Sequence, residues 1–156
     1  MSKEFKKVKS EDLINFATNV FQFYGLNYNN SRLWSEVLVW ANLRGVDSHG
    51  VLRIPLYTEY LEKGIINSDP NLRLNQLSGA IARLDSDLAP GPVALKEGME
   101  VAISKAEEFN LGWCAISNMT HAGAVGFFSL LASKKGFAGI VMTASQPMMA
   151  YPGTHE

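Results

Sequence analysis

Apolar residues in the first third of the chain recur every three or four positions, which is the spacing of amphipathic helices. The spacing predicts helices over about residues 10–25, 31–43 and 55–64, with a glycine at the end of the first and of the third. Residues 44–53 do not continue the pattern. We therefore expect them to form the longest break between helices in this part of the chain.

The pattern changes after a turn-rich connection at residues 64–70. Short apolar runs then alternate with helical patterns, so that expected strands cover residues 80–84, 111–117 and 137–143, and expected helices cover residues 93–109 and 124–135. Alternation of this kind is typical of an α/β layer, in which helices pack on a sheet. The run at residues 111–117 is apolar throughout, as expected for a strand covered on both faces.

Together the two patterns predict an α/β protein, with an N-terminal helical segment followed by a β-α-β-α-β layer. We place the helical region at residues 1–75 and the α/β region at residues 76–156. Three strands make a small sheet with unpaired edges, which proteins usually cover. The layer is therefore expected to be incomplete and to need further chain or a partner.

Composition narrows the class of protein. The net charge is −1 and the one basic run, at residues 3–9, is short, so the chain lacks the concentrated basic surface of a nucleic-acid-binding protein. No apolar run approaches the ~20 residues of a membrane span, and the N-terminus lacks the apolar core of a signal peptide. The one cysteine, Cys114, lies in an expected strand and is interpreted as an inert thiol rather than a nucleophile. We expect a reducing, cytoplasmic setting without nucleic-acid or membrane partners.

The break after the second expected helix concentrates reactive side chains. Arg44-Gly45-Val46-Asp47-Ser48-His49-Gly50 and Arg53 bring two guanidinium groups, a carboxylate, a hydroxyl and an imidazole into one segment. Arginine grips a carboxylate through two parallel hydrogen bonds, and histidine transfers protons near neutral pH. The segment is therefore a candidate site for a small carboxylic acid. The alternative is a polar loop that caps a helix, with Ser48 and His49 bonded to nearby backbone.

A second group of candidate residues lies where an expected strand leads into an expected helix. His121, followed by Gly123 and Gly126, comes after the strand at residues 111–117, and ligands of α/β sheets gather at the carboxyl ends of strands. We expect the N-terminus of the next helix to keep His121 neutral and to favour an anionic substrate nearby. The alternative is a histidine bonded to backbone near an N-cap. Ser145, at the end of the third expected strand, is a candidate for binding a phosphate or ribose hydroxyl, or a simple turn residue.

Two other chemistries find no support in the spacing. Asp47, Ser48 and His49 are adjacent and cannot form a catalytic triad, and the chain has no Gly-x-Ser-x-Gly motif. A metal site made of His49, His121 and His155 is conceivable because imidazole is a common ligand. Neither a His-x-x-x-His pair nor a carboxylate cluster accompanies these histidines, so no metal is expected.

Four stretches of the sequence together resemble the malate/L-lactate dehydrogenase family of the second type. They are Ala41–Gly50 with Val51 and Arg53, then Gly64-Ile65-Ile66-Asn67, then His121-x-Gly123-Ala124, then Gly136-x-x-Gly139-Ile140. The resemblance extends from about Ser10 to Gly153. It implies nicotinamide-dependent oxidation and reduction of 2-hydroxy and 2-oxo acids. It also implies a family-specific fold with a mixed sheet, without the Rossmann Gly-x-Gly-x-x-Gly fingerprint.

The resemblance implies roles for individual residues. His121 would be the general base that takes the hydroxyl proton as a hydride leaves C2, and the acid in the reverse direction. Arg53 would clamp the substrate carboxylate, while Ser48 and His49 would orient the substrate. Ser145 would contact the cofactor, which is NAD, with NADP as the alternative. The implied partners are a small 2-hydroxy or 2-oxo acid and, for the full-length form, a second copy in a homodimer.

Two segments favour one substrate within the family. Residues 116–124 and 145–148 are most similar to members that oxidise ureidoglycolate in allantoin degradation. Within the first of these segments, Met119 and Ala122 stand where many malate and lactate members have a serine and an aromatic residue. Malate, L-lactate or a cyclic imino acid is the alternative substrate. The family chain is much longer, so the resemblance covers an N-terminal half. A non-catalytic fragment that needs a partner is the third interpretation.

Overall fold

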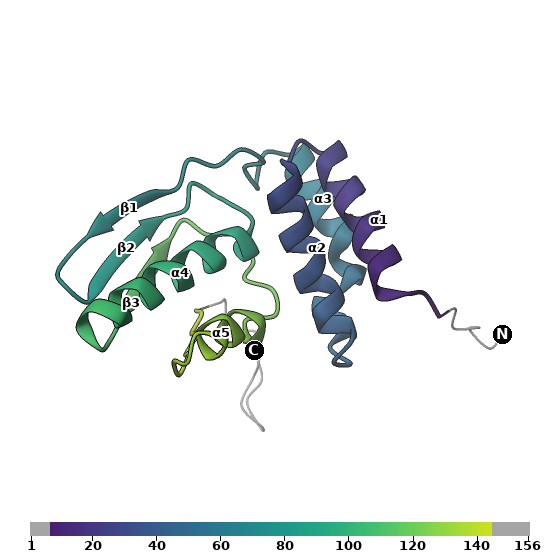
Figure 1. Cartoon of the computed structure of the whole chain (residues 1–156). Helices are drawn as coiled ribbons and strands as arrows, with labels where there is room; N and C mark the ends of the chain where they lie inside the picture. Colours follow the sequence, from purple (N-terminus) through teal and green to yellow (C-terminus); the bar gives the residue numbers. More distant parts are fainter. Residues whose placement is uncertain (1–6, 145–156) are drawn as a thin grey trace, which may run out of the picture.

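The computed structural model of the protein describes residues 7–144 (Figure 1). The helices are α1 (Ser10–Phe23), α2 (Tyr28–Asn42), α3 (Ile54–Glu62), α4 (Gly91–Phe109) and α5 (Gly126–Lys134), and two short 3₁₀ turns, η1 (Asp47–His49) and η2 (Val51–Arg53), precede α3. The strands are β1 (Arg73–Gln76), β2 (Ile81–Asp85) and β3 (Trp113–Ser117). Helices α1, α2 and α3 form one part of the molecule, and the sheet with α4 and α5 forms the other. The expected α/β class is confirmed.

Aromatic packing holds the three N-terminal helices together. Phe21 stacks on Trp34 with ring centroids 4.3 Å apart, and the ring of Tyr57 lies 4.8 Å from that of Trp34. Aromatic pairs of this kind contribute about 0.5–1.5 kcal/mol each beyond the apolar area that they bury. Asn27 caps α2 by accepting the backbone N–H of Asn30 at 2.9 Å. This cap starts α2 earlier than the apolar spacing indicates, because the first turn of the helix is polar.

The sheet is three-stranded and mixed, with the strand order β1-β2-β3. β1 pairs antiparallel with β2, and β2 pairs parallel with β3 through a crossover that contains α4 (Figure 1). In β2, Ala82 and Leu84 are buried while Ile81 and Arg83 are exposed, as expected for a strand with one covered face. The side chains of β1 are all exposed. Apolar patterning could not predict this strand, because it forms through backbone pairing with β2.

Two expectations about the later apolar runs are wrong. β3 is the edge strand of the described sheet: Cys114 and Ile116 lie against Gly98 of α4, but the side chain of Trp113 is 48% exposed. β3 is therefore covered on one face rather than on both. Residues 137–143 form no strand. A cavity separates them from β3, so their backbone cannot pair with that edge, and apolar composition alone supplies no hydrogen-bond partner.

The two parts of the molecule meet through α2. Val37 of α2 packs with Leu95 of α4 and Phe128 of α5 in one buried cluster. Trp40 of α2 meets Phe127 edge to face, with ring centroids 5.8 Å apart. These contacts place the break between α2 and α3 beside the connection between β3 and α5. Candidate residues from two segments that are far apart in the sequence thereby come together.

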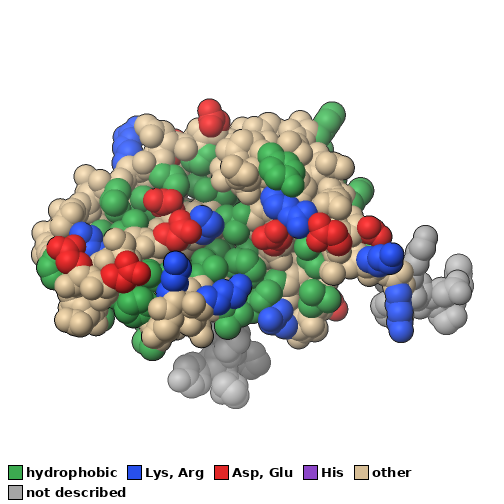
Figure 2. Space-filling model, viewed as in Figure 1, with side chains coloured by type: hydrophobic (Ala, Val, Ile, Leu, Met, Phe, Trp, Pro, Cys, Tyr) green, Lys and Arg blue, Asp and Glu red, His purple; other side chains and the backbone are tan. Residues whose placement is uncertain are grey.

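The surface carries mixed charge on the face that Figure 2 presents, where acidic and basic side chains are interspersed. Some of these charges pair along helices, as Lys63 does with Glu59 and Lys96 with Glu100. Exposed pairs of this kind contribute only about 0.3–0.5 kcal/mol each. Among residues 7–144, no helix is both long enough and apolar enough to cross a membrane.

Candidate active site

Asn42, the last residue of α2, organises the segment that leads to α3. Its Oδ1 accepts the backbone N–H of Val51 at 2.9 Å, and its Nδ2 donates to Asp47 Oδ1 at 2.5 Å. Gly50 leaves room for this side chain, since a Cβ at Gly50 would meet Asn42 Cγ at 2.5 Å. One amide side chain therefore sets the path of the backbone from η1 to η2.

The two 3₁₀ turns present Ser48, His49 and Arg53 together. The Ser48 hydroxyl oxygen and His49 Nδ1 are 3.1 Å apart, within hydrogen-bond distance. Arg53 Nε donates to the Ser48 carbonyl oxygen at 2.6 Å, which fixes the plane of the guanidinium group. Its two terminal nitrogens make no hydrogen bond to the described part of the chain. A guanidinium held in this way can bind a carboxylate through two parallel hydrogen bonds.

His121 lies on the connection between β3 and α5, which is tied to the connection between β2 and α4. The Thr120 hydroxyl donates to the Ala89 carbonyl oxygen at 2.9 Å. Gly91, the first residue of α4, lies directly beneath the backbone of His121, so that a Cβ there would overlap the His121 carbonyl oxygen. The backbone of His121 is thereby held at the boundary between the two parts of the fold.

The fold brings His121 to residues of η1, η2 and α3. Its ring lies beside that of His49, with centroids 5.6 Å apart and planes 27° from parallel. Its Nδ1 is 2.8 Å from the hydroxyl oxygen of Tyr57. The positive charge of Arg53 acts on both His121 and Tyr57. We call Ser48, His49, Arg53, Tyr57 and His121 the His121 cluster.

The surroundings lower the pKa of His121 below its ordinary value of 6.5. Desolvation is the largest cause, and the positive charge of Arg53 and the neighbouring imidazole of His49 add to it. From the sequence, the N-terminus of the following helix is expected to keep His121 neutral. That expectation is wrong, because α5 begins only at Gly126 and leaves His121 outside its first turn. The imidazole is therefore poised to accept a proton at neutral pH.

Tyr57 is the member of the cluster that sequence reasoning missed. Its place on the apolar face of α3 and its 1% exposure mark it as a core residue. Burial raises the pKa of its hydroxyl to about 12, although the charge of Arg53 opposes the shift, so the hydroxyl is protonated at neutral pH. The one sequence signal for Tyr57 is its position a single helical turn after Arg53, which places both residues on one side of the segment.

The two other charged residues of the same segment have separate partners. Arg44 stacks over the indole of Trp40, with Cζ 3.8 Å from the ring centroid, and donates to the Trp40 carbonyl oxygen at 3.2 Å. Asp47 accepts the hydrogen bond from Asn42. These charges shape the loop, whereas Ser48, His49 and Arg53 lie with His121.

The His121 cluster combines two capacities that are needed side by side on a small hydroxy acid. Arg53 can hold a carboxylate, and His121 can accept or return a proton. His121 Nε2 makes no hydrogen bond to residues 7–144, so it is the ring nitrogen left for a ligand.

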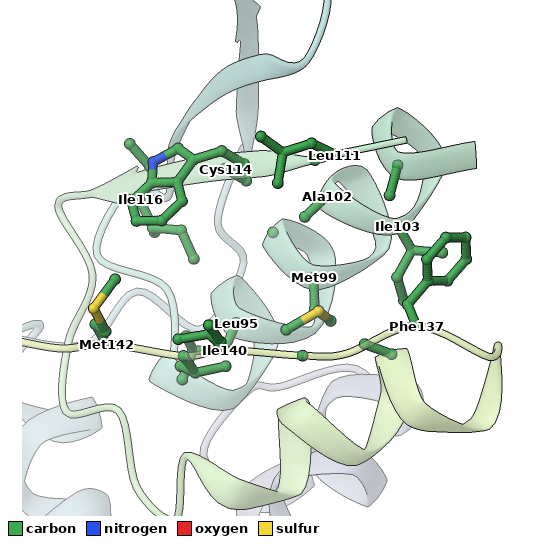
Figure 3. A pocket seen from close by; sticks show the side chains of 18 of the residues that line it. Leu95, Met99, Ala102, Ile103, Leu111, Cys114, Ile116, Phe137, Ile140 and Met142 are labelled. Atoms are coloured by element: carbon green, nitrogen blue, oxygen red, sulfur yellow. The ribbon is translucent and has the colours of Figure 1, made fainter. Parts of the chain in front are cut away.

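A cavity of about 760 Å³ is lined by residues other than the cluster. Apolar side chains of α4, β3 and residues 137–144 point into it, as Figure 3 shows. Among the described residues that line it, Cys114 is the one titratable residue, and burial raises the pKa of its thiol, in keeping with an inert cysteine. Its lining within residues 7–144 thus offers no acid or base suited to proton transfer.

Two candidate residues, Ser145 and His155, lie outside the described residues. Within residues 7–144, no group of three or more His, Cys, Asp or Glu side chains is arranged to hold a metal ion. The described candidates for chemistry are therefore those of the His121 cluster.

Known proteins resemble this chain in both sequence and structure. A family described as malate/L-lactate dehydrogenase matches residues 8–156. Ureidoglycolate dehydrogenase (NAD(+)) of Escherichia coli (strain K12) is 38% identical over 150 residues, which make up 96% of this chain and 43% of that protein. L-sulfolactate dehydrogenase of Methanocaldococcus jannaschii is 35% identical over 149 residues, again 96% of this chain and 43% of that protein.

The fold has close counterparts among solved structures. Malate dehydrogenase of Pyrococcus horikoshii OT3 superposes with a TM-score of 0.83 at 30% identity, over 86% of this chain and 39% of that one. The matched region is thus similar in backbone as well as in sequence. The chain spans 43% of the length of the curated relatives described above.

Proposed function

Because the chain belongs to the malate/L-lactate dehydrogenase family, we propose that it carries the substrate-binding and proton-transfer part of a nicotinamide-dependent oxidoreductase. The reaction interconverts a 2-hydroxy acid and a 2-oxo acid. The observation that carries the proposal is the meeting of Arg53 and His121, which come from the two parts of the fold, in one cluster with His49. A 2-hydroxy acid has its carboxylate and hydroxyl on adjacent carbons, so a clamp and a base must lie side by side.

In the oxidation direction His121 acts as the general base. Its Nε2 takes the hydroxyl proton of the substrate while the C2–H bond breaks, the electron pair leaves C2 as a hydride, and the C–O bond becomes a carbonyl. In the reduction direction the imidazolium returns the proton to the carbonyl oxygen. The lowered pKa of His121 keeps the base form available at neutral pH. A positioned acid or base contributes about 10² to 10⁴ in rate.

Arg53 binds the substrate carboxylate, and Ser48 and His49 orient the substrate. Because the charge of Arg53 contributes to the lowered pKa of His121, a bound carboxylate offsets part of that charge. Substrate binding therefore makes His121 a somewhat stronger base. Arg53 and His121 are therefore coupled electrostatically as well as by their positions.

A nicotinamide accepts the hydride when it is bound. The donor set fits this cofactor, because the cluster holds a base and a carboxylate clamp but no redox-active group of its own. We propose NAD, with NADP as the alternative, and Ser145 as a cofactor contact. The name of the Escherichia coli relative, which specifies NAD(+), supports this choice.

Ureidoglycolate is the substrate that we propose. The 38% identity to a ureidoglycolate dehydrogenase supports it, together with Met119 and Ala122 at positions where many malate and lactate members differ. Malate, L-lactate, sulfolactate or a cyclic imino acid is the alternative. We further propose that residues 1–75 contribute substrate and dimer contacts and residues 76–156 contribute to the nicotinamide-binding domain, in a cytoplasmic homodimer.

The test is substrate-dependent reduction of NAD⁺ or NADP⁺ with a panel of these acids. The chain is assayed alone and mixed with the remaining C-terminal part of the Escherichia coli relative. His121→Asn should lower kcat by about 10² to 10⁴, and Arg53→Lys should raise KM because it removes the planar, bidentate grip. Arg83→Lys, an exposed residue of β2, is the control and should change neither constant. The absence of nicotinamide reduction with every acid in both preparations contradicts the proposal.

A second candidate function is a non-catalytic fragment that binds a carboxylate or pairs with a longer subunit. The observation in its favour is that the chain spans 43% of its relatives' length. Saturable binding of a 2-oxo acid without nicotinamide reduction in either preparation would favour this second candidate.

A further inference from the structure

We propose that Tyr57 is the positioning residue of His121. Its hydroxyl oxygen accepts the Nδ1–H of the imidazole, so that Nε2 is the nitrogen that exchanges a proton with the substrate. The inference rests on the proposed role of His121 as acid and base, and it identifies the group that selects the working nitrogen.

The position of the Tyr57 hydroxyl is set by the helical core. The ring is buried, lies 4.8 Å from Trp34, and Trp34 in turn stacks on Phe21 at 4.3 Å. A ring held on α3 by this stack cannot follow movements of the loops. The oxygen, 2.8 Å from His121 Nδ1, is thus a fixed point that reaches from one part of the fold to the imidazole of the other.

The direction of the hydrogen bond follows from the chemistry of the two working forms of histidine. A neutral imidazole carries one N–H and one lone pair, and an imidazolium carries two N–H groups. To act as a base, His121 needs its lone pair on the free nitrogen, Nε2, and therefore its hydrogen on Nδ1, facing Tyr57. After protonation the Nδ1–H still donates to the same oxygen. One hydrogen bond therefore serves both forms, whereas a bond donated by Tyr57 would put the hydrogen on Nε2.

The charges around the pair are consistent with a neutral acceptor. Arg53 and His49 face His121, and Arg53 and Tyr60 face Tyr57. Burial keeps the Tyr57 hydroxyl protonated, since it raises its pKa to about 12. In the described part of the chain, no carboxylate bonds to His121 Nδ1. Tyr57 therefore occupies the place of the third group that orients a catalytic base.

The test compares Tyr57→Phe with Tyr60→Phe in the 156-residue chain. Tyr57→Phe keeps the ring and its contact with Trp34 and removes only the oxygen. Tyr60→Phe makes the same change on the same helix, at a residue that makes no hydrogen bond to His121 in the described part of the chain. The readout is the ¹⁵N shifts of the His121 ring across a pH titration. In the wild type we expect the neutral ring to carry its hydrogen on Nδ1. Tyr57→Phe should move it towards Nε2, the form preferred by free histidine, and should lower the pKa of His121 further. Tyr60→Phe should leave both unchanged.

Kinetics give a second readout that a merely structural role would not produce. In the nicotinamide assay, Tyr57→Phe should lower kcat about tenfold, less than the 10² lower limit for losing the base, with KM unchanged. A loss of core packing would instead reduce stability and the amount of active protein without altering the tautomer.

The outcomes separate this inference from the proposed function. An unchanged His121 tautomer in Tyr57→Phe overturns the inference, whether or not the enzyme is active. A shifted tautomer in a chain that reduces no nicotinamide supports the hydrogen bond and contradicts the proposed function. Should Tyr57→Phe not fold, the wild type decides: a slowly exchanging Nδ1–H with cross-relaxation to the Tyr57 ring supports the inference, and a hydrogen on Nε2 overturns it.

Discussion

Replacing Asn42 with alanine removes the two hydrogen bonds that define the loop between α2 and α3. The bond from the Val51 N–H, at 2.9 Å, is partly buried, and the bond to Asp47, at 2.5 Å, is exposed to solvent. A neutral hydrogen bond contributes about 1 kcal/mol. The bond to the Asp47 carboxylate is charge-assisted, but because it is exposed to solvent we assign it only about 0.5 kcal/mol. The loop should therefore open more easily by about 1.5 kcal/mol. At 1.4 kcal/mol per factor of ten, this corresponds to roughly a tenfold larger open population.

Amide hydrogen exchange measures this opening directly. The Val51 N–H is bonded to the Asn42 side chain, so its exchange should accelerate about tenfold in Asn42→Ala. Because η1 and η2 carry Ser48, His49 and Arg53, the same variant should also weaken carboxylate binding, but by less than the exchange effect, since affinity falls only with the fraction of molecules whose loop is closed. Both effects arise from one side chain that itself touches no ligand.

Asn27→Ala is the matched control. It also removes an asparagine that accepts a backbone N–H, in this case that of Asn30 at 2.9 Å, and the loss of such a cap costs about 1 kcal/mol. It lies at the other end of α2, so exchange should accelerate at Asn30 and not at Val51. Exchange at Val51 that is unchanged in Asn42→Ala, or accelerated equally by Asn27→Ala, would refute the reasoning.

Further predictions concern pH, reactivity and packing. The folded state lowers the pKa of His121 below 6.5, so the unfolded state binds more protons than the folded state as the pH falls. The free energy of unfolding should therefore decrease below pH 6.5. Urea titrations should show a weaker decrease in His121→Asn than in the wild type. For the same reason, the acid limb of kcat/KM for hydroxy-acid oxidation should lie below pH 6.5 and not above it. Cys114 should react with iodoacetamide more slowly than free cysteine, as followed by mass spectrometry, because burial raises its pKa; equal rates would contradict this. Gly91→Ala should cost about 1–3 kcal/mol and shift the ring resonances of His121, whereas Gly64→Ala, whose Cβ meets no atom within 4 Å, should leave those resonances in place.

Apolar periodicity predicted the elements that bury one face. The three N-terminal helices follow it, because their apolar faces pack together. The strands β2 and β3 were predicted from short apolar runs, and both pack against α4. β1 was not predicted, because it is stabilised by backbone pairing with β2 and its exposed side chains form no pattern that indicates this pairing. Residues 137–143 show the opposite case, because their composition favours a strand, but in the structure they line a cavity together with β3 and form no strand.

The sequence predicted those residues of the candidate site whose side chains are themselves reactive. Ser48, His49, Arg53 and His121 are conspicuous in sequence, and the structure brings them together. Tyr57 was hidden because a buried tyrosine on an apolar helix face looks like core, and only the fold shows where its hydroxyl emerges. The cause of the lowered pKa of His121 was equally out of reach, since it depends on neighbours that are distant in sequence.

The most direct measurement of the central claim is a titration of the chain with oxamate, a non-reacting analogue of a 2-oxo acid, followed by NMR at the Arg53 side chain and the His121 ring. We expect saturable shifts at both residues. The shift of the His121 ring should be lost in Arg53→Gln, both shifts should be retained in Arg83→Gln, and acetate should produce a change at Arg53 alone in the wild type. Oxamate that perturbs neither residue in the wild type, or that shifts the His121 ring in Arg53→Gln as much as in the wild type, would contradict the assignment of this cluster as the site of a 2-hydroxy acid dehydrogenase.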